Sequence, residues 1–196
     1  MRLAEFLLLV LVGWTTVGAL GISVSFLQHQ RQKALRHLGW LLTVWAIYLA
    51  TVIGVSVTQR QRFVTVGTPQ CFDEMCFTVA GFDEPKGYLL KDSRLVRVKV
   101  SITNRGHKPE SESLLRAYLV DRQGRRWDEV HGLSGVRLTA RVAAGETVTS
   151  EPVFKVDEDT TPEGLVLTHG SRQPGVLVIG DSDSLLHRPT VARLVK

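Results

Sequence analysis

The sequence has 196 residues, 44% of them hydrophobic, and its 24 Lys and Arg against 19 Asp and Glu give a formal net charge of +5. Six basic residues but only one acidic residue, Glu5, precede Phe63, so the chain from Phe63 onward carries 18 of each and is formally neutral. Because a nucleic-acid-binding domain concentrates basic charge on its own surface, this balance excludes nucleic acid as a partner. The roughly 135 residues that follow the apolar N-terminal part suffice for one domain with its own core.

Two apolar runs without a charged residue dominate the N-terminal part, over residues 6–26 and 38–57. Each is long enough to cross a bilayer as a helix, which takes about 20 residues. We expect a first transmembrane helix over residues 1–27, a loop over residues 28–37 and a second transmembrane helix over residues 38–58. Residues 59–196 are then expected to form a water-soluble domain.

The basic residues around the two runs predict their orientation in the membrane. Three lie in the loop, one precedes the first run and two follow the second: Arg31, Lys33 and Arg36, then Arg2, then Arg60 and Arg62. Short loops rich in Lys and Arg stay in the cytoplasm, so we expect a two-pass protein whose C-terminal domain is periplasmic or extracellular. The alternative is a signal peptide cleaved after Ala19, which would leave the domain in the cytoplasm. The apolar sequence that continues to Phe26 disfavours this alternative.

Small residues recur every four positions on one face of the second predicted helix, at Ala46, Ala50 and Gly54. Small side chains at this spacing let two helix backbones approach closely. We expect this face to pack against the first helix, which offers Gly21 and Ser25. The alternative use is association with a second copy of the chain or with another membrane protein.

The two cysteines, Cys71 and Cys76, are separated by four residues. This spacing suits a hairpin turn closed by a disulfide, a bond that persists outside the cytoplasm. A zinc site would need a second pair of ligands. Two membrane helices followed by a β domain are also the layout of cytochrome oxidase subunit II, whose copper motif has three residues between its cysteines and a histidine and a methionine nearby. Here the next histidine is His107, so the disulfide is the favoured interpretation and we expect no metal or other cofactor.

The chain after residue 62 is predicted to be all-β. Residues 96–102 alternate strictly between apolar and polar side chains, which is typical of a strand with one buried face. Further strands are expected over residues 63–67, 77–80, 114–120, 136–142, 147–156, 165–168, 175–179 and 190–195. Many short strands separated by turn signals favour a β-sandwich.

Four segments carry a resemblance to a known family: residues 98–104 (VKVSITN), 121–124 (DRQG), 145–147 (GET) and 152–156 (PVFKV). They resemble the immunoglobulin-like extracytoplasmic domains of unknown function that occur in bacterial lipoproteins and membrane-anchored proteins. The resemblance covers about residues 63–169. It implies an immunoglobulin-like sandwich in a bacterial periplasmic or cell-surface protein, and it transfers no catalytic residue.

Residues 178–182 (VIGDS) also resemble the serine block of SGNH hydrolases, with His187 as a possible base. That family places the block at the start of an α/β domain, so we interpret residues 180–183 as a turn. Asp181 and Asp183, with Asp157 and Asp159, lack the complete oxygen ligand series of a calcium site.

The four histidines of the domain have no metal-binding spacing and are expected at loops or strand ends: His107, His131, His169 and His187. Trp127 is expected in the core or at its rim.

These observations predict an all-β immunoglobulin-like sandwich preceded by an α-helical transmembrane hairpin. The expected function is that of a non-enzymatic binding module held beside the membrane, with a protein partner in the bacterial envelope. Two alternatives are a metal-binding or electron-transfer subunit with the layout of oxidase subunit II, and a hydrolase that uses Ser182.

Overall fold

The computed structural model describes residues 3–85, 92–130, 132–133, 135–169, 174–181 and 184–194. The chain divides into two compact units. The hairpin unit comprises Met1–Arg60 together with Gln173–Arg188, and the sandwich unit comprises Gln61–Arg172 together with Pro189–Lys196. Residues 173–188 therefore group with the helices, whereas the sequence predicted a single soluble domain over residues 59–196.

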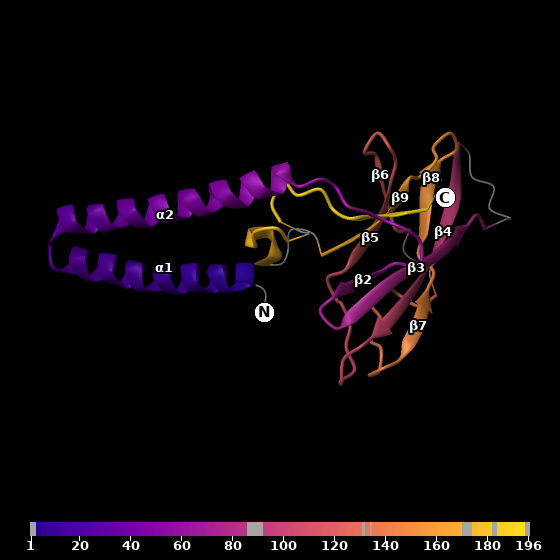
Figure 1. Ribbon diagram of the computed structural model, residues 1–196, viewed down its shortest axis with the longest axis horizontal. Coiled ribbons are helices and arrows are strands. Elements are labelled where there is room, and N and C mark those ends of the chain that lie inside the picture. The colour runs from indigo at the N-terminus through magenta and orange to yellow at the C-terminus, as the bar shows by residue number, and fades with distance from the viewer. Residues whose placement is uncertain are drawn as a thin grey trace. The chain divides into compact units, whose positions relative to one another are not determined.

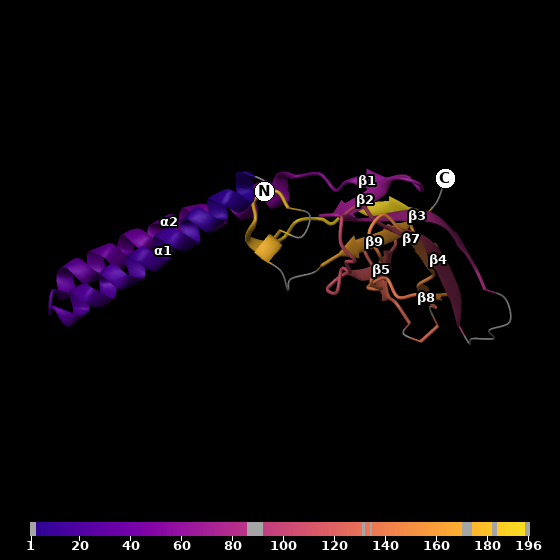
Figure 2. The ribbon, with the colours of Figure 1, turned by 90° about the horizontal axis from the view of Figure 1, so that it is seen from below.

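The hairpin unit is built on two antiparallel helices, α1 (Leu3–Leu27) and α2 (Arg31–Thr58), which run side by side in Figures 1 and 2. Both are long and apolar enough to cross a membrane, judged from length and composition. They end where the sequence predicted, but α2 begins seven residues before the predicted start at residue 38. The predicted loop residues 31–37 contain neither Gly nor Pro and several good helix formers, so they extend α2.

The contact between the two helices follows a coiled-coil spacing. Apart from Glu5, the less exposed residues of α1 alternate at intervals of four and three: Ala4, Leu8, Leu11, Thr15, Gly18, Ile22 and Ser25. This interval is typical of left-handed helix packing. Trp45 Nε1 donates a hydrogen bond to Thr15 Oγ1 over 2.9 Å. A Cβ placed on Gly18 would lie 2.7 Å from Leu41 Cδ1, so a larger residue there would require the Leu41 side chain to shift.

The sandwich unit consists of two β-sheets. The first has the order β1-β10-β9-β5-β6, and in the second β4 lies between β3 and the pair β7 and β8, with β2 beyond β3. The strands are β1 (Phe63–Val64), β2 (Pro69–Phe72), β3 (Met75–Asp83), β4 (Ser93–Asn104), β5 (Arg116–Val120), β6 (Arg126–Asp128), β7 (Thr147–Ser150), β8 (Val153–Asp157), β9 (Gly164–Thr168) and β10 (Val191–Arg193). All neighbouring strands are antiparallel except β1 and β10, which are parallel.

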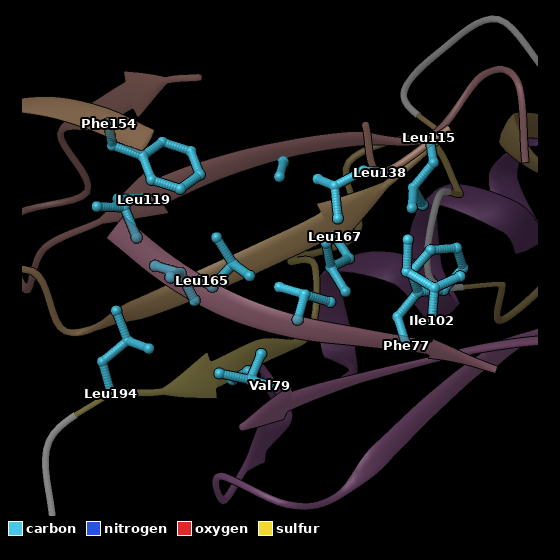
Figure 3. Packing of buried hydrophobic residues seen from close by; sticks show 14 of the residues in the cluster. Phe77, Val79, Ile102, Leu115, Leu119, Leu138, Phe154, Leu165, Leu167 and Leu194 are labelled. Carbon is cyan, nitrogen blue, oxygen red and sulfur yellow. The ribbon is translucent and has the colours of Figure 1, made fainter. Parts of the chain in front are cut away.

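The core lies between the two sheets and confirms the predicted alternation of β4. Its buried face carries Val96, Val98, Val100 and Ile102, all at most 2% exposed. Figure 3 shows Phe77 and Ile102 of one sheet pointing toward the same interior as Leu165 and Leu167 of the other. One contiguous hydrophobic cluster therefore joins both sheets.

Two predicted strands are wrong. Residues 136–142 form turns and a single bridge between Glu110 and Val142, because Leu138 and Val142 are buried at a spacing of four instead of alternating with exposed neighbours. Residues 175–179 form most of a short 3-10 helix, η2 (Pro174–Leu177), and the turn after it. An apolar, β-branched run suits a buried strand and a buried turn alike, and its length alone could not separate them.

Candidate functional site

A cleft of about 850 Å³ opens in the sandwich unit beside the first residues of β5. It arises because β6 pairs with β5 only over three residues, Tyr118–Val120 against Arg126–Asp128. Beyond Asp128 the chain leaves β5: Glu129 bridges to Phe154 of the other sheet, and Val130 N–H donates to Val153 O over 2.8 Å. The start of β5 consequently has no neighbouring strand on this side among the described residues.

The cleft combines an apolar floor with a charged rim. Leu115, Ala117 and Leu138 supply buried apolar side chains, none of them more than 5% exposed. The other lining residues are Arg116, Asp128, Glu129, Gly132, Gly135, Arg137 and Thr139. Segment 135–139 is held in place by Ser150, whose Oγ donates to Val136 O over 2.6 Å.

The rim charges are available to a ligand. Arg116, Asp128 and Arg137 are exposed, and within the described ranges none of the three forms an ion pair. Two guanidinium groups and two carboxylates around an apolar floor suit a ligand with an apolar group flanked by charges of both signs. A polypeptide in extended conformation has this chemistry.

The turn between β5 and β6 is closed by a charged side chain. Asp121 is buried, and its two carboxylate oxygens accept hydrogen bonds from Arg125 N–H (2.8 Å) and Arg125 Nε–H (2.7 Å). Burial raises the pKa of Asp121, but the hydrogen bonds and the positive charge of Arg125 outweigh it and hold the pKa below its usual value. The Arg125 guanidinium also lies 5.5 Å from the centre of the Trp127 ring.

Asp121→Asn is expected to lower the free energy of unfolding at pH 7 by about 2 kcal/mol, the usual value of hydrogen bonds to a charged group. A carboxylate with a lowered folded-state pKa stabilises the protein above its unfolded-state pKa, about 4, and this contribution is lost as pH falls through the folded-state value. The variant should therefore lose less stability than the wild type between pH 7 and pH 3. Urea unfolding in detergent at both pH values measures the difference. Asp159→Asn, at an exposed position, is the control, and an equal acid dependence in wild type and Asp121→Asn would contradict the prediction.

The predicted disulfide is present between Cys71 and Cys76, which face each other across β2 and β3. Both sulfur atoms are bonded to each other, so the geometry gives the oxidase-like copper hypothesis no thiolate ligand. Among the described residues, no three His, Cys, Asp or Glu side chains come together in a metal-binding arrangement.

The predicted packing of Ala46, Ala50 and Gly54 against the first helix is wrong. All three are exposed in the hairpin unit, and a Cβ placed on Gly54 would meet nothing within 4 Å. The residues of α2 that contact Gly18 and Thr15 of α1 are larger and lie on the opposite side of the helix: Leu41 and Trp45. Close approach is provided by Gly18 of α1 instead, which leaves association with another membrane helix as the remaining prediction for the small residues.

The residues weighed for hydrolase and calcium chemistry are not brought together in the part of the chain that the structure describes. Ser182, Asp183 and His131 lie outside the described residues, Asp181 belongs to the hairpin unit, and Asp157 forms an ion pair with Arg125 at 3.8 Å.

The remaining aromatic and histidine candidates are structural or lie in different parts of the fold. His107 is exposed, and His187 belongs to the hairpin unit. His169 directly follows β9, where it is buried and its Nε2 lies 3.0 Å from Glu112 Oε2. Trp127 packs at the rim of the core, as predicted.

Sequence reasoning missed the cleft residues and one structural anchor. Arg116 and Arg137 are ordinary surface arginines in the sequence, and only the departure of β6 from β5 brings them to one cleft. Asn104, the last residue of β4, is fully buried, and its side chain forms three hydrogen bonds with the backbone.

No protein-family model matches the sequence, and no curated protein matches it. Three solved structures are similar in fold. An uncharacterized β-sandwich protein from Clostridium difficile is 13% identical, with 56% of this chain and 89% of that chain covered and a TM-score of 0.43. A secreted protein from Mycobacterium tuberculosis is 9% identical (57% and 92% covered, TM-score 0.45). A conserved hypothetical protein from Bacillus anthracis is 13% identical (53% and 87% covered, TM-score 0.43). The sandwich assignment rests on the strand pairing of this chain itself.

Proposed function

We propose that the protein is a membrane-anchored, non-enzymatic binding module that holds an immunoglobulin-like sandwich outside the cytoplasm and binds a polypeptide of the cell envelope in the cleft beside β5. The observation that carries the proposal is the apolar floor of the cleft together with Arg116, Asp128 and Arg137 at its rim, which form no ion pair among the described residues.

Three features support the anchor. The two helices have the length and composition of membrane spans. Arg31, Lys33 and Arg36 lie in the first two turns of α2, next to the turn that joins the helices, and Lys and Arg at such a position favour the cytoplasmic side. The hairpin then directs the end of α2 to the opposite side, where the disulfide between Cys71 and Cys76 is chemically stable.

An immunoglobulin-like topology is supported by the strand order. The first strand of the sandwich pairs in parallel with the last, Phe63 beside Val191, while the remaining neighbours are antiparallel. In immunoglobulin-like sandwiches, loops at the ends of the sheets carry recognition. The cleft here is bounded by one such segment, of which residues 132–133 and 135–139 are described, and it lies beside the start of β5 that has no described strand next to it.

A polypeptide partner fits the cleft better than a metal ion or a nucleic acid. The backbone of Arg116 and Ala117 has no strand beside it on the cleft side among the described residues, so an extended chain can pair with it. Leu115 and Leu138 offer contacts for an apolar side chain, and the rim offers partners for both Lys or Arg and Asp or Glu.

Site-specific photocrosslinking in intact cells tests this function. A benzophenone amino acid at Thr139, in the cleft, should give a crosslinked product of one defined mass, whereas the same group at Lys155, on the exposed face of β8, should not. Adding Arg116→Glu and Arg137→Glu should reduce the Thr139 product about tenfold, since losing two charge-assisted contacts costs more than 1.4 kcal/mol. No product from Thr139, or equal products from both positions, would refute the cleft as the binding site.

A further inference from the structure

Most of the described segment between β9 and β10 groups with the two helices in the hairpin unit. We call its described residues, 174–181 and 184–188, the strap. The strap belongs to the hairpin unit and contains η2. Figures 1 and 2 show η2 beside the open end of the hairpin, where α1 begins and α2 ends.

Polar contacts fix the strap to α2 at two positions along the helix. Tyr48 OH donates a hydrogen bond to Leu177 O over 2.7 Å. Nearer the end of α2, the hydroxyls of Ser56 and Ser184 lie 2.9 Å apart, and both residues are buried. The strap therefore runs along the side of α2.

These contacts place part of the strap beside the middle of α2 and not only beside its C-terminal end. Tyr48 precedes Thr58, the last residue of α2, by ten residues, which corresponds to about 15 Å along the helix axis. The hydrocarbon core of a bilayer is about 30 Å thick. If the apolar residues 38–57 span this core, Tyr48 lies near its middle, and Leu177, which accepts the hydrogen bond from Tyr48, lies at a similar depth.

The strap meets the requirement for a non-helical segment at this depth, which is that its backbone hydrogen bonds are made within the protein. Asp181 N–H donates to Val178 O over 3.3 Å, Leu185 N–H to Val176 O over 3.0 Å, and His187 N–H to Ser184 O over 2.9 Å. Together with the bond from Tyr48 to Leu177 O, these bonds reduce the cost of leaving water.

The turn at the end of the strap presents apolar side chains outward. Val178 is buried, whereas Leu185 is 39% exposed and Leu186 is 64% exposed. Leu186 adopts a positive φ of 62°, which is unfavourable for a side chain of this kind. An exposed leucine pair at a strained turn is costly in water and favourable in an acyl-chain environment.

We propose that the strap inserts into the leaflet from which α2 emerges and that the Leu185–Leu186 turn contacts lipid acyl chains. This proposal rests on the proposed function, in that α2 must span a membrane. Arg60 follows α2 and Arg188 ends the strap, so both can bind anionic headgroups above the acyl chains. The strap then adds a second membrane attachment, located between β9 and β10, to the one through α2.

Fluorescence quenching by brominated lipids tests the proposal on the full chain in vesicles. Both native cysteines are bonded to each other, so a single introduced cysteine can be labelled selectively with an environment-sensitive dye. The positions are Leu186→Cys on the strap, Ile47→Cys on the exposed side of α2, and Lys155→Cys on the exposed face of β8 in the sandwich. In vesicles of phosphatidylcholine and phosphatidylglycerol brominated in the acyl chains, we expect the emission at positions 186 and 47 to fall by about half, and that at position 155 to stay unchanged.

The pattern of quenching separates the two proposals. Quenching at position 47 without quenching at position 186 would overturn the strap insertion and leave the membrane anchor intact. No quenching at position 47 would refute the anchor itself. Leu185→Cys provides a second strap position whose backbone is not in the left-handed region, so a local disturbance at Leu186 cannot produce a false negative result.

Discussion

Phe154→Ala is expected to lower the free energy of unfolding of the sandwich by about 4 kcal/mol, the usual cost of removing a buried phenylalanine side chain. Phe154 is completely buried and lies opposite Val96 in the β4–β8 pair. It is also the residue to which Glu129 bridges when the chain leaves β6 for the other sheet. Figure 3 shows its ring beside Leu119 of β5, so its loss opens a cavity between the two sheets.

Urea unfolding of the full chain in detergent, followed by circular dichroism in the β-sheet region, measures this effect. Phe82→Ala is the matched control, because Phe82 of β3 is 46% exposed and its removal leaves no cavity. We expect the control to cost less than about 1 kcal/mol. Equal losses in the two variants would mean that Phe154 does not pack between the sheets.

Asn104→Ala should lower the free energy of unfolding by about 3 kcal/mol, since three hydrogen bonds are lost at about 1 kcal/mol each. Asn104 Nδ2 donates to Lys108 O (2.7 Å) and Val142 O (2.9 Å), and Oδ1 accepts from Gly106 N–H (2.8 Å). These bonds fasten the turn after β4 to the segment that follows the cleft. Without them, buried backbone groups would remain unsatisfied.

Two further variants separate hydrogen bonding from packing at this position. Asn104→Asp keeps the shape and the acceptor for Gly106 N–H but cannot donate to two carbonyl oxygens, so it should be at least as destabilised as Asn104→Ala. Thr103→Ala removes an exposed hydroxyl that lies 2.9 Å from Thr147 Oγ1, and it should change stability by less than about 0.5 kcal/mol. An Asn104→Asp variant as stable as the wild type would contradict the assignment.

The elements that the sequence predicted are those with a local signal. The alternation over residues 96–102 is produced by β4 itself, the spacing of Cys71 and Cys76 by one hairpin, and the apolar runs by single helices. The prediction about contacts between two distant segments, the packing of the small residues of α2 against α1, was wrong. Ala46, Ala50 and Gly54 lie on the outer side of α2 because the side that faces α1 carries large residues, and no property of the small residues alone specifies the side.

The cleft and the strap depend on tertiary structure in the same way. Arg116 and Arg137 come together because β6 leaves β5 after three residues, an event set by the bridge to Phe154. Residues 175–179 read as a strand because they are apolar and β-branched, but Tyr48 and Ser56, more than 100 positions away, offer the contacts that fold them onto α2. A single sequence does not reveal such partners.

The pairing of β10 between β9 and β1 has a consequence for folding kinetics. Phe63 and Val191 are neighbours although 128 positions separate them, and contacts of this separation close large loops and slow folding. Until β10 arrives, β9 presents an unpaired edge to its surroundings, and the core lacks Ala192 and Leu194. An unpaired strand edge beside an incomplete core can pair with a strand of another chain. The newly made sandwich is therefore most prone to aggregation in the interval before β10 joins the sheet.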